Sequence, residues 1–120
     1  MMYRKAVCFK DKAIAKEILA TEDVAYIKKL GRLVFNYNEN IWNGLRQLIV
    51  YEGLQAKFTQ NSFLRQNLVN TQNAILAECA VKDCVWGIGL STTDPMRFNI
   101  NAWKGKNLFG YSLMMVRDNL

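Results

Sequence analysis

Two motifs rich in tryptophan and glycine, both in the last third of the chain, constrain its fold more than any other feature. The first, E-x4-D-x2-W-G-x-G, begins at Glu78, and the second, W-x-G-x-N-x2-G-x2-L-M-x2-R, begins at Trp103. Tryptophan supplies a large flat surface, and glycine lets another group come close to the backbone. Trp86 followed by Gly87 therefore indicates an aromatic wall beside a backbone that something approaches closely. A tryptophan-anchored turn packed under a C-terminal helix explains the same pattern without a ligand.

Length and composition predict one folded domain over residues 1–120. A chain of 120 residues with 51% hydrophobic residues and a single proline can build one core, but not two. No apolar run approaches the ~20 residues that span a bilayer, and no signal-peptide pattern opens the chain. We therefore expect a cytoplasmic protein that does not contact membranes.

Charge and side-chain inventory narrow the chemistry. The net charge of +6 suits a phosphate-bearing partner, although a solvated lysine-rich surface explains the dispersed basic residues equally well. The absence of histidine excludes Ser–His and Cys–His nucleophilic schemes. Cys8, Cys79 and Cys84 lack metal-ligand spacing, so we expect reduced thiols, no metal and no cofactor.

The spacing of apolar residues predicts a mainly helical α+β domain. It indicates two short helices within residues 3–20, the second capped by Asp11, and a third helix that begins at residues 21–23 and ends near Gly31. A long helix over residues 39–60, one capped by Ser62 and a last one over residues 107–119 follow. Segment 74–79 fits a buried strand or more helix, segment 85–90 a strand or turn, and residues 91–101 a polar loop. The predicted class is therefore mainly α with a few short strands.

The long helix carries an apolar stripe at three- and four-residue spacings, which we expect to be buried. The stripe consists of Ile41, Leu45, Leu48, Ile49, Leu54 and Phe58.

The C-terminal motifs resemble those of a known family when a set of upstream residues is considered with them. These residues are Met2, Lys5-Ala6, Lys29-Leu30-Gly31-Arg32, Trp42 and Ala56-Lys57-Phe58. In order and spacing the whole series resembles the NADAR family, also called YbiA-like, over nearly the entire chain. The resemblance implies a mostly helical α+β domain that cleaves N-glycosidic bonds. Its implied substrates are phosphorylated ribosylamino-pyrimidines of early riboflavin synthesis, or ADP-ribose attached to guanine.

The same resemblance implies two catalytic residues, Lys5 and Asp83. Lys5 matches the lysine of the family's N-terminal helix motif. Its amine, with a pKa lowered by burial or by Arg4 or Arg32, can form a Schiff base with an opened ribose. Asp83 matches a pocket residue and can orient ribose hydroxyls or accept a proton. Each has a plainer interpretation, because lysines usually lie on solvated helix faces and aspartates usually form turns.

Substrate binding is assigned to aromatic walls, phosphate ligands and two backbone-shaping residues. Trp42 and Trp86 match residues of the family's pocket and can sandwich a base or sugar between their rings. We expect both rings to lie in one cleft with Lys5 and Asp83. Arg32 or Lys57 can receive a phosphate. The full expected set is Arg32, Trp42, Lys57, Trp86, Gly87 and Asn107. The alternatives are that Trp42 belongs to the core, that Asn107 caps a helix, and that Glu78 and Arg117 form a structural ion pair.

One departure from the family leaves several functions open. We expect the family's N-terminal strand segment and its glutamate to be absent, which would uncover apolar surface and favour self-association or a partner chain. An N-glycosidase that binds an ADP-ribose-like or ribose-phosphate ligand, with ADP-ribosylated DNA as a candidate partner, ranks first. A degenerate module that binds ADP-ribose or another nucleotide without chemistry ranks second. A small basic interaction protein that keeps only the fold ranks third.

Overall fold

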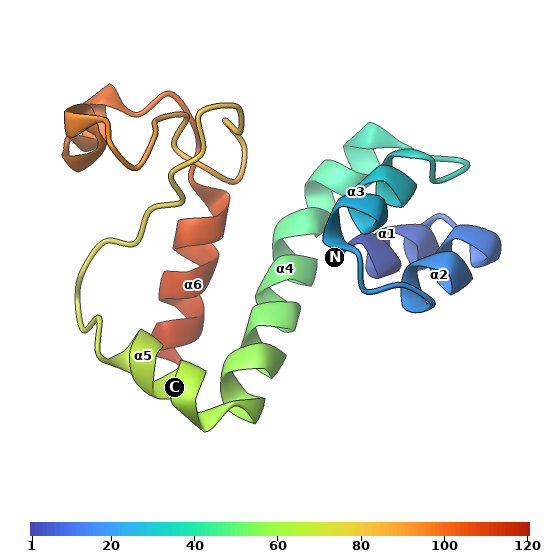
Figure 1. Cartoon of the computed structure of the whole chain (residues 1–120), viewed down its shortest axis with the longest axis horizontal. Coiled ribbons are helices and arrows are strands. Elements are labelled where there is room, and N and C mark those ends of the chain that lie inside the picture. The colour runs from blue at the N-terminus through green and yellow to red at the C-terminus, as the bar shows by residue number, and fades with distance from the viewer. The chain divides into compact units, whose positions relative to one another are not determined.

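The computed structural model describes all 120 residues, which form two compact units, Met1–Ile49 and Val50–Leu120 (Figure 1). The α-helices are α1 (Met2–Cys8), α2 (Lys12–Leu19), α3 (Val24–Arg32), α4 (Glu39–Gln60), α5 (Ser62–Val69) and α6 (Leu108–Asp118). Two short 3-10 helices, η1 (Pro95–Phe98) and η2 (Ile100–Ala102), precede α6. No helix combines the length and apolarity that a membrane crossing requires.

Aspartate caps begin two helices of the first unit, and the sequence predicts the first of these caps, Asp11. The Asp11 carboxylate accepts the Ile14 N–H at 3.1 Å and so begins α2. Asp23 accepts the backbone N–H groups of Ala25 and Tyr26 at 3.0 and 3.2 Å and begins α3. These carboxylates satisfy donors that the first helical turn leaves without partners.

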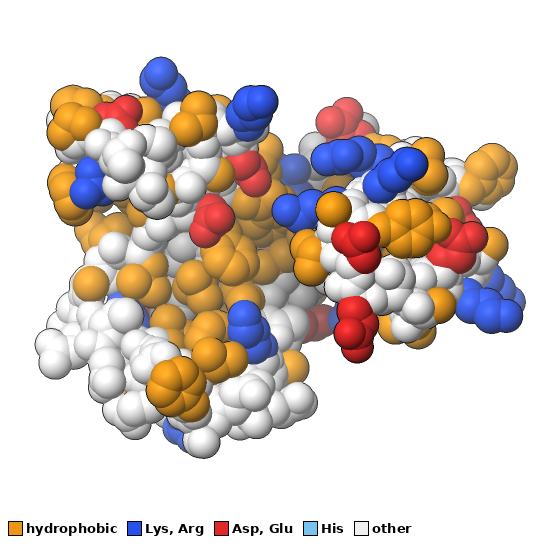
Figure 2. Space-filling view, viewed as in Figure 1, with side chains coloured by type: hydrophobic (Ala, Val, Ile, Leu, Met, Phe, Trp, Pro, Cys, Tyr) orange, Lys and Arg blue, Asp and Glu red, His pale blue; other side chains and the backbone are white.

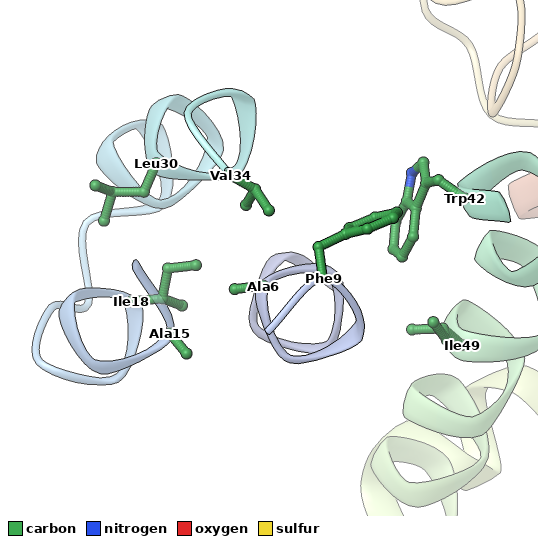
Figure 3. Close-up of a cluster of buried hydrophobic side chains, with 8 residues drawn as sticks. All are labelled: Ala6, Phe9, Ala15, Ile18, Leu30, Val34, Trp42 and Ile49. Atoms are coloured by element: carbon green, nitrogen blue, oxygen red, sulfur yellow. The ribbon is translucent and has the colours of Figure 1, made fainter. Parts of the chain in front are cut away.

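The core of the first unit is small and joins α1, α2 and α3 to the first half of α4. Its buried side chains are Ala6, Phe9, Ala15, Ile18, Leu30, Val34, Trp42 and Ile49. Figure 3 shows Phe9, the residue that follows α1, pointing toward Trp42 of α4 within this cluster.

The second unit packs the end of α4 against α5 and α6 around Leu54, Leu68 and Val116. A long connecting segment runs from the end of α5 to the start of α6 (Figure 1). The predicted polar loop at residues 91–101 lies within it and contains η1 and η2.

The predicted short strands are wrong, because the chain forms no strand. Segments 74–79 and 85–90 are held instead by single backbone bonds between loops, such as Ile88 N–H to the Glu78 carbonyl at 2.9 Å. The Ile88 carbonyl in turn accepts the N–H groups of Lys104 and Gly105. Gly89, at φ +73, turns the backbone out of the extended region, so no regular ladder continues past it.

The long helix has the predicted bounds, but only part of its predicted stripe is buried. Ile49 and Leu54 are buried, whereas Ile41, Leu45 and Leu48 are 50%, 37% and 55% exposed. Adjacent positions differ by about 100° around a helix, so burying Trp42 rotates Ile41 away from the core of the first unit.

The start of α5 also differs from the prediction. Asn61, at φ −127, occupies the N-cap position of α5 and makes no side-chain capping bond, and Ser62 is the first helical residue.

Candidate functional site

Lys5 is half-buried on α1 and faces two aromatic rings. Its Nζ lies 4.5 Å from the centroid of the Tyr37 ring and 5.8 Å from that of Trp42. Both distances are within the range of cation–π attraction. Tyr37 follows a turn in which Asn36 adopts a left-handed φ of 56°. Helix α1, a turn and helix α4 therefore together position one amine.

The environment lowers the pKa of Lys5 below the ordinary lysine value. Burial is the main cause, and the positive charge of Arg32 at the end of α3 adds to it. Both effects penalise the ammonium form, which is the condition that a Schiff-base role of Lys5 requires. A lowered pKa gives Lys5 a larger neutral fraction near neutral pH, and the neutral amine is the form that attacks carbonyl carbon.

Trp42 belongs to the core and to the surroundings of Lys5 at once. Its side chain is only 6% exposed and packs in the same cluster as Phe9. Phe9 in turn meets Tyr37 edge-on, with ring centroids 5.5 Å apart. The rings beside Lys5 are thus fixed by the core of the first unit, which restrains the amine they contact.

Asp83 forms a turn that sets the direction of Trp86. Its Oδ1 accepts the backbone N–H of Val85 at 3.0 Å and that of Trp86 at 2.8 Å. Trp86 is half-buried, and its carbonyl accepts the Phe109 N–H at the start of α6. The aspartate of the first motif therefore couples its tryptophan to the last helix, which is the turn role foreseen as the plainer interpretation.

Gly87 and Asn107 lie at the centre of a backbone junction that the two C-terminal motifs form together. A Cβ on Gly87 would sit 2.8 Å from the Asp83 carbonyl oxygen and 2.9 Å from that of Glu78. Asn107 is fully buried at φ 53°; its amide nitrogen donates to the Leu76 carbonyl at 2.9 Å, and its amide oxygen accepts the Glu78 N–H at 3.0 Å. This asparagine precedes α6 and ties residues 76–78 to the helix start.

The predicted phosphate ligands are both exposed cations. Arg32 ends α3 in the first unit, and Lys57 lies near the end of α4, with its Nζ 5.7 Å from the Phe58 ring centroid. Arg117 donates to the Thr71 hydroxyl at 2.9 Å and to the Ala74 carbonyl at 2.8 Å, so it braces the segment after α5. Figure 2 shows lysines and arginines on both units.

The expected site residues divide into two groups by unit. Lys5, Arg32 and Trp42 meet in the first unit, together with Tyr37, which sequence reasoning missed. The signal for Tyr37 was its place in a predicted turn between helices, where an aromatic residue has little reason to be unless it packs. The second group, in the second unit, consists of Lys57, Asp83, Trp86, Gly87 and Asn107. The single cleft expected for residues of both groups remains a prediction.

Comparison with known proteins gives the chain a clear kinship. The family model described as the NADAR domain matches residues 1–120. N-glycosidase R617 of Acanthamoeba polyphaga mimivirus is 40% identical over 98% of this chain and 69% of its own length. N-glycosidase YbiA of Escherichia coli K12 is 30% identical over 98% of this chain and 67% of its own length.

A third relative is much longer. Riboflavin biosynthesis protein VVA0006 of Vibrio vulnificus is 30% identical over 98% of this chain, but the matched region is 29% of that protein. The region shared with all three relatives thus covers almost the whole of this chain and only part of each relative.

Proposed function

Because the chain belongs to the NADAR domain family, we propose that it acts as an N-glycosidase-like hydrolase on a ribose-phosphate conjugate. The observation that carries the proposal is Lys5, a half-buried amine with a lowered pKa beside the Tyr37 and Trp42 rings. The names of the two N-glycosidase relatives support the bond type. The substrate is ADP-ribosylated guanine, free or in DNA, or a phosphorylated ribosylamino-pyrimidine, and the name of the Vibrio relative supports the second.

In the proposed reaction Lys5 acts as the nucleophile. Ring opening leaves C1 of the ribose joined to the leaving nitrogen as an imine. The neutral amine of Lys5 adds to C1, and both of its protons pass to the leaving nitrogen, which departs as an amine and leaves C1 joined to Lys5 as a new imine. Water then hydrolyses the imine between Lys5 and C1, which releases the sugar aldehyde and restores the amine. The sum is hydrolysis of one N-glycosidic bond.

The other residues have binding and positioning roles in this proposal. Arg32 receives a phosphate, for which an exposed guanidinium is well suited, and its charge also keeps the pKa of Lys5 low. Lys57 is a second candidate for phosphate. Asp83 uses Oδ1 for the turn, so its Oδ2 is the atom that would meet a ribose hydroxyl. Gly87 and Asn107 act by shaping the backbone on which Trp86 stands.

A module that binds ADP-ribose or another nucleotide without chemistry is the second candidate. The observation in its favour is that the side chains of Asp83 and Asn107 already form hydrogen bonds with backbone groups of their own unit. The fold would still require these two residues even if the chain had lost catalytic activity.

Borohydride trapping separates the two candidates. We expect borohydride, added during turnover of ADP-ribosylated guanine or of the ribosylamino-pyrimidine phosphate, to leave a covalent adduct on Lys5. Lys5→Arg keeps the charge but cannot form an imine, so it should abolish both the adduct and base release. Lys12→Arg, at an exposed position that opens α2, is the matched control. Base release by Lys5→Arg would refute the role of Lys5 as the nucleophile. If the wild type binds the ligand but shows neither adduct nor base release, the chain is the binding module.

A further inference from the structure

A groove of about 320 Å³ opens in the second unit beside the two 3-10 helices. The groove walls are Ile75, Cys79, Ile100, Arg97, Phe98 and Trp103, with Ala77 between the first two. Its volume lies at the lower end of the range of about 300–1,000 Å³ that holds small ligands. No lining side chain is a carboxylate, and Arg97 supplies a positive charge. The groove therefore suits a compact anionic ligand.

Arg97 is held in place on two sides. Its guanidinium carbon lies 4.2 Å from the centroid of the Phe98 ring, and its Nη1 donates to the Asp94 carbonyl at 2.8 Å. That bond occupies only one of the several N–H groups of a guanidinium. A fixed guanidinium with further donors is the side chain best matched to a phosphate group.

Phe98 and Trp103 provide flat surfaces on the same groove. Phe98 is 80% exposed, a large apolar area for water to cover, with the Arg97 cation over its ring. Trp103 donates its indole N–H to the Arg97 carbonyl at 2.8 Å, which fixes the indole as a wall and satisfies its one polar atom. Asp94 caps η1 through the Met96 N–H at 2.9 Å and so braces the segment that carries these rings.

We propose that this groove binds a nucleobase, stacked on the exposed Phe98 ring, with a phosphate of the same nucleotide unit at Arg97. Stacking on an aromatic ring accepts any base, while the guanidinium selects an anionic ligand over a neutral one. A purely apolar partner would leave the cation unused. The inference goes beyond the proposed N-glycosidase activity, because none of the residues that line the groove has a role in the reaction proposed at Lys5.

Binding of two probes tests the proposal. At low salt we expect a labelled, short single-stranded oligodeoxynucleotide or free GMP to bind, as followed by fluorescence anisotropy and calorimetry respectively. Phe98→Ala should weaken binding about tenfold, the order of one lost base-stacking contact, whereas Phe98→Tyr should keep it. Arg97→Gln should weaken binding and flatten its salt dependence. Tighter binding of the oligonucleotide than of GMP would identify a nucleic acid strand as the ligand. Equal affinity for the two probes would identify a free nucleotide, and both results support the proposed groove.

The chain offers a matched control for the aromatic truncation. Phe63 on α5 is 75% exposed and lies outside the groove, so Phe63→Ala removes a similar ring and should leave binding unchanged. Because Phe98 is largely exposed, Phe98→Ala should also melt like the wild type. Lys12→Arg, at an exposed position outside the groove, should also bind both probes normally. Both measurements report binding of an unmodified probe rather than base release, which keeps this test apart from that of the proposed reaction. Absence of binding to either probe, wild-type affinity of Phe98→Ala, or affinity indifferent to salt would overturn the proposal.

Discussion

The Lys5 amine lies 4.5 Å from the centroid of the Tyr37 ring, and this pair opposes the other influences on the lysine. An aromatic face attracts the ammonium form, whereas burial and the charge of Arg32 disfavour it, and the net effect is a lowered pKa. The amine is therefore anchored by one neighbour and kept easy to deprotonate by others. A nucleophilic lysine needs both properties.

Arg32→Gln should raise the pKa of Lys5, because it removes the nearby positive charge that disfavours protonation. An NMR titration of the Lys5 amine in the free protein measures the shift without substrate. In the proposed reaction the pH at which base release reaches half its maximum should move upward by the same amount. Lys28→Gln, another cation of α3, is the control. An unchanged Lys5 titration in Arg32→Gln would contradict the electrostatic role.

Asp11 should make the protein acid-sensitive. Hydrogen bonds from the Phe35 N–H at 2.8 Å and from the Ile14 N–H at 3.1 Å lower its pKa below 3.8. Since the folded-state pKa is the lower one, this stabilisation is fully present above the unfolded-state value and is lost as the pH falls through the folded-state pKa.

Thermal melts between about pH 5 and pH 2 measure this effect. The melting temperature of Asp11→Asn should fall less steeply across this range than that of the wild type, although it starts lower. Glu22→Gln removes a carboxylate of the same unit outside this contact and serves as the control. Parallel curves for Asp11→Asn and the wild type would show that the two hydrogen bonds contribute nothing to the pH dependence.

Asn107→Ala should destabilise the second unit by about 2–4 kcal/mol, because it leaves the Leu76 carbonyl and the Glu78 N–H without the partners they now have. It also places an alanine at φ 53°, which adds about 1 kcal/mol. Asn107→Gly relieves that backbone strain while still losing the amide. Chemical denaturation of both variants separates the two contributions, and equal stability of Asn107→Ala and the wild type would mean that solvent replaces both bonds.

Two glycines should respond to alanine in opposite directions. Gly110→Ala would press its Cβ against the Leu76 carbonyl and the Asn107 amide, so it should cost about 1–3 kcal/mol or more. Gly53 lies on α4 with no atom within 4 Å of its Cβ position, so Gly53→Ala should add up to about 1 kcal/mol. Urea unfolding of the pair checks the signs. A stabilising Gly110→Ala would show that the junction around Asn107 yields easily.

Local patterns predicted the helices well and the C-terminal junction poorly. Asp11 could be identified as a cap, and the start of α3 could be placed near residues 21–23, because a cap acts within three residues of itself. The burial of Ile49 but not of Ile41 could not be identified, because both fit the spacing of one helix and only the neighbouring elements choose between adjacent faces. The segments expected as strands failed for a related reason, since a strand exists only when a second segment runs alongside it in register.

The candidate site shows the same division. Lys5 and Trp42 could be selected from the sequence because their residue types and their places in the family pattern are local facts, and Trp42 proved to be core as well as a neighbour of Lys5. Tyr37 could not be selected, since its role depends on a turn that brings its ring to 4.5 Å from the Lys5 amine.

By itself the sequence determined where most helices begin and end, that Asp11 caps one of them, and membership of the NADAR family, because each depends on residue identity and spacing along the chain. Only the tertiary structure decided which apolar face is buried, how Asn107 joins residues 76–78 to α6, and that the pKa of Lys5 is lowered. Burial, hydrogen bonding across distant segments and electrostatic coupling all depend on distances through space. Residues far apart in the chain acquire those distances only when it folds.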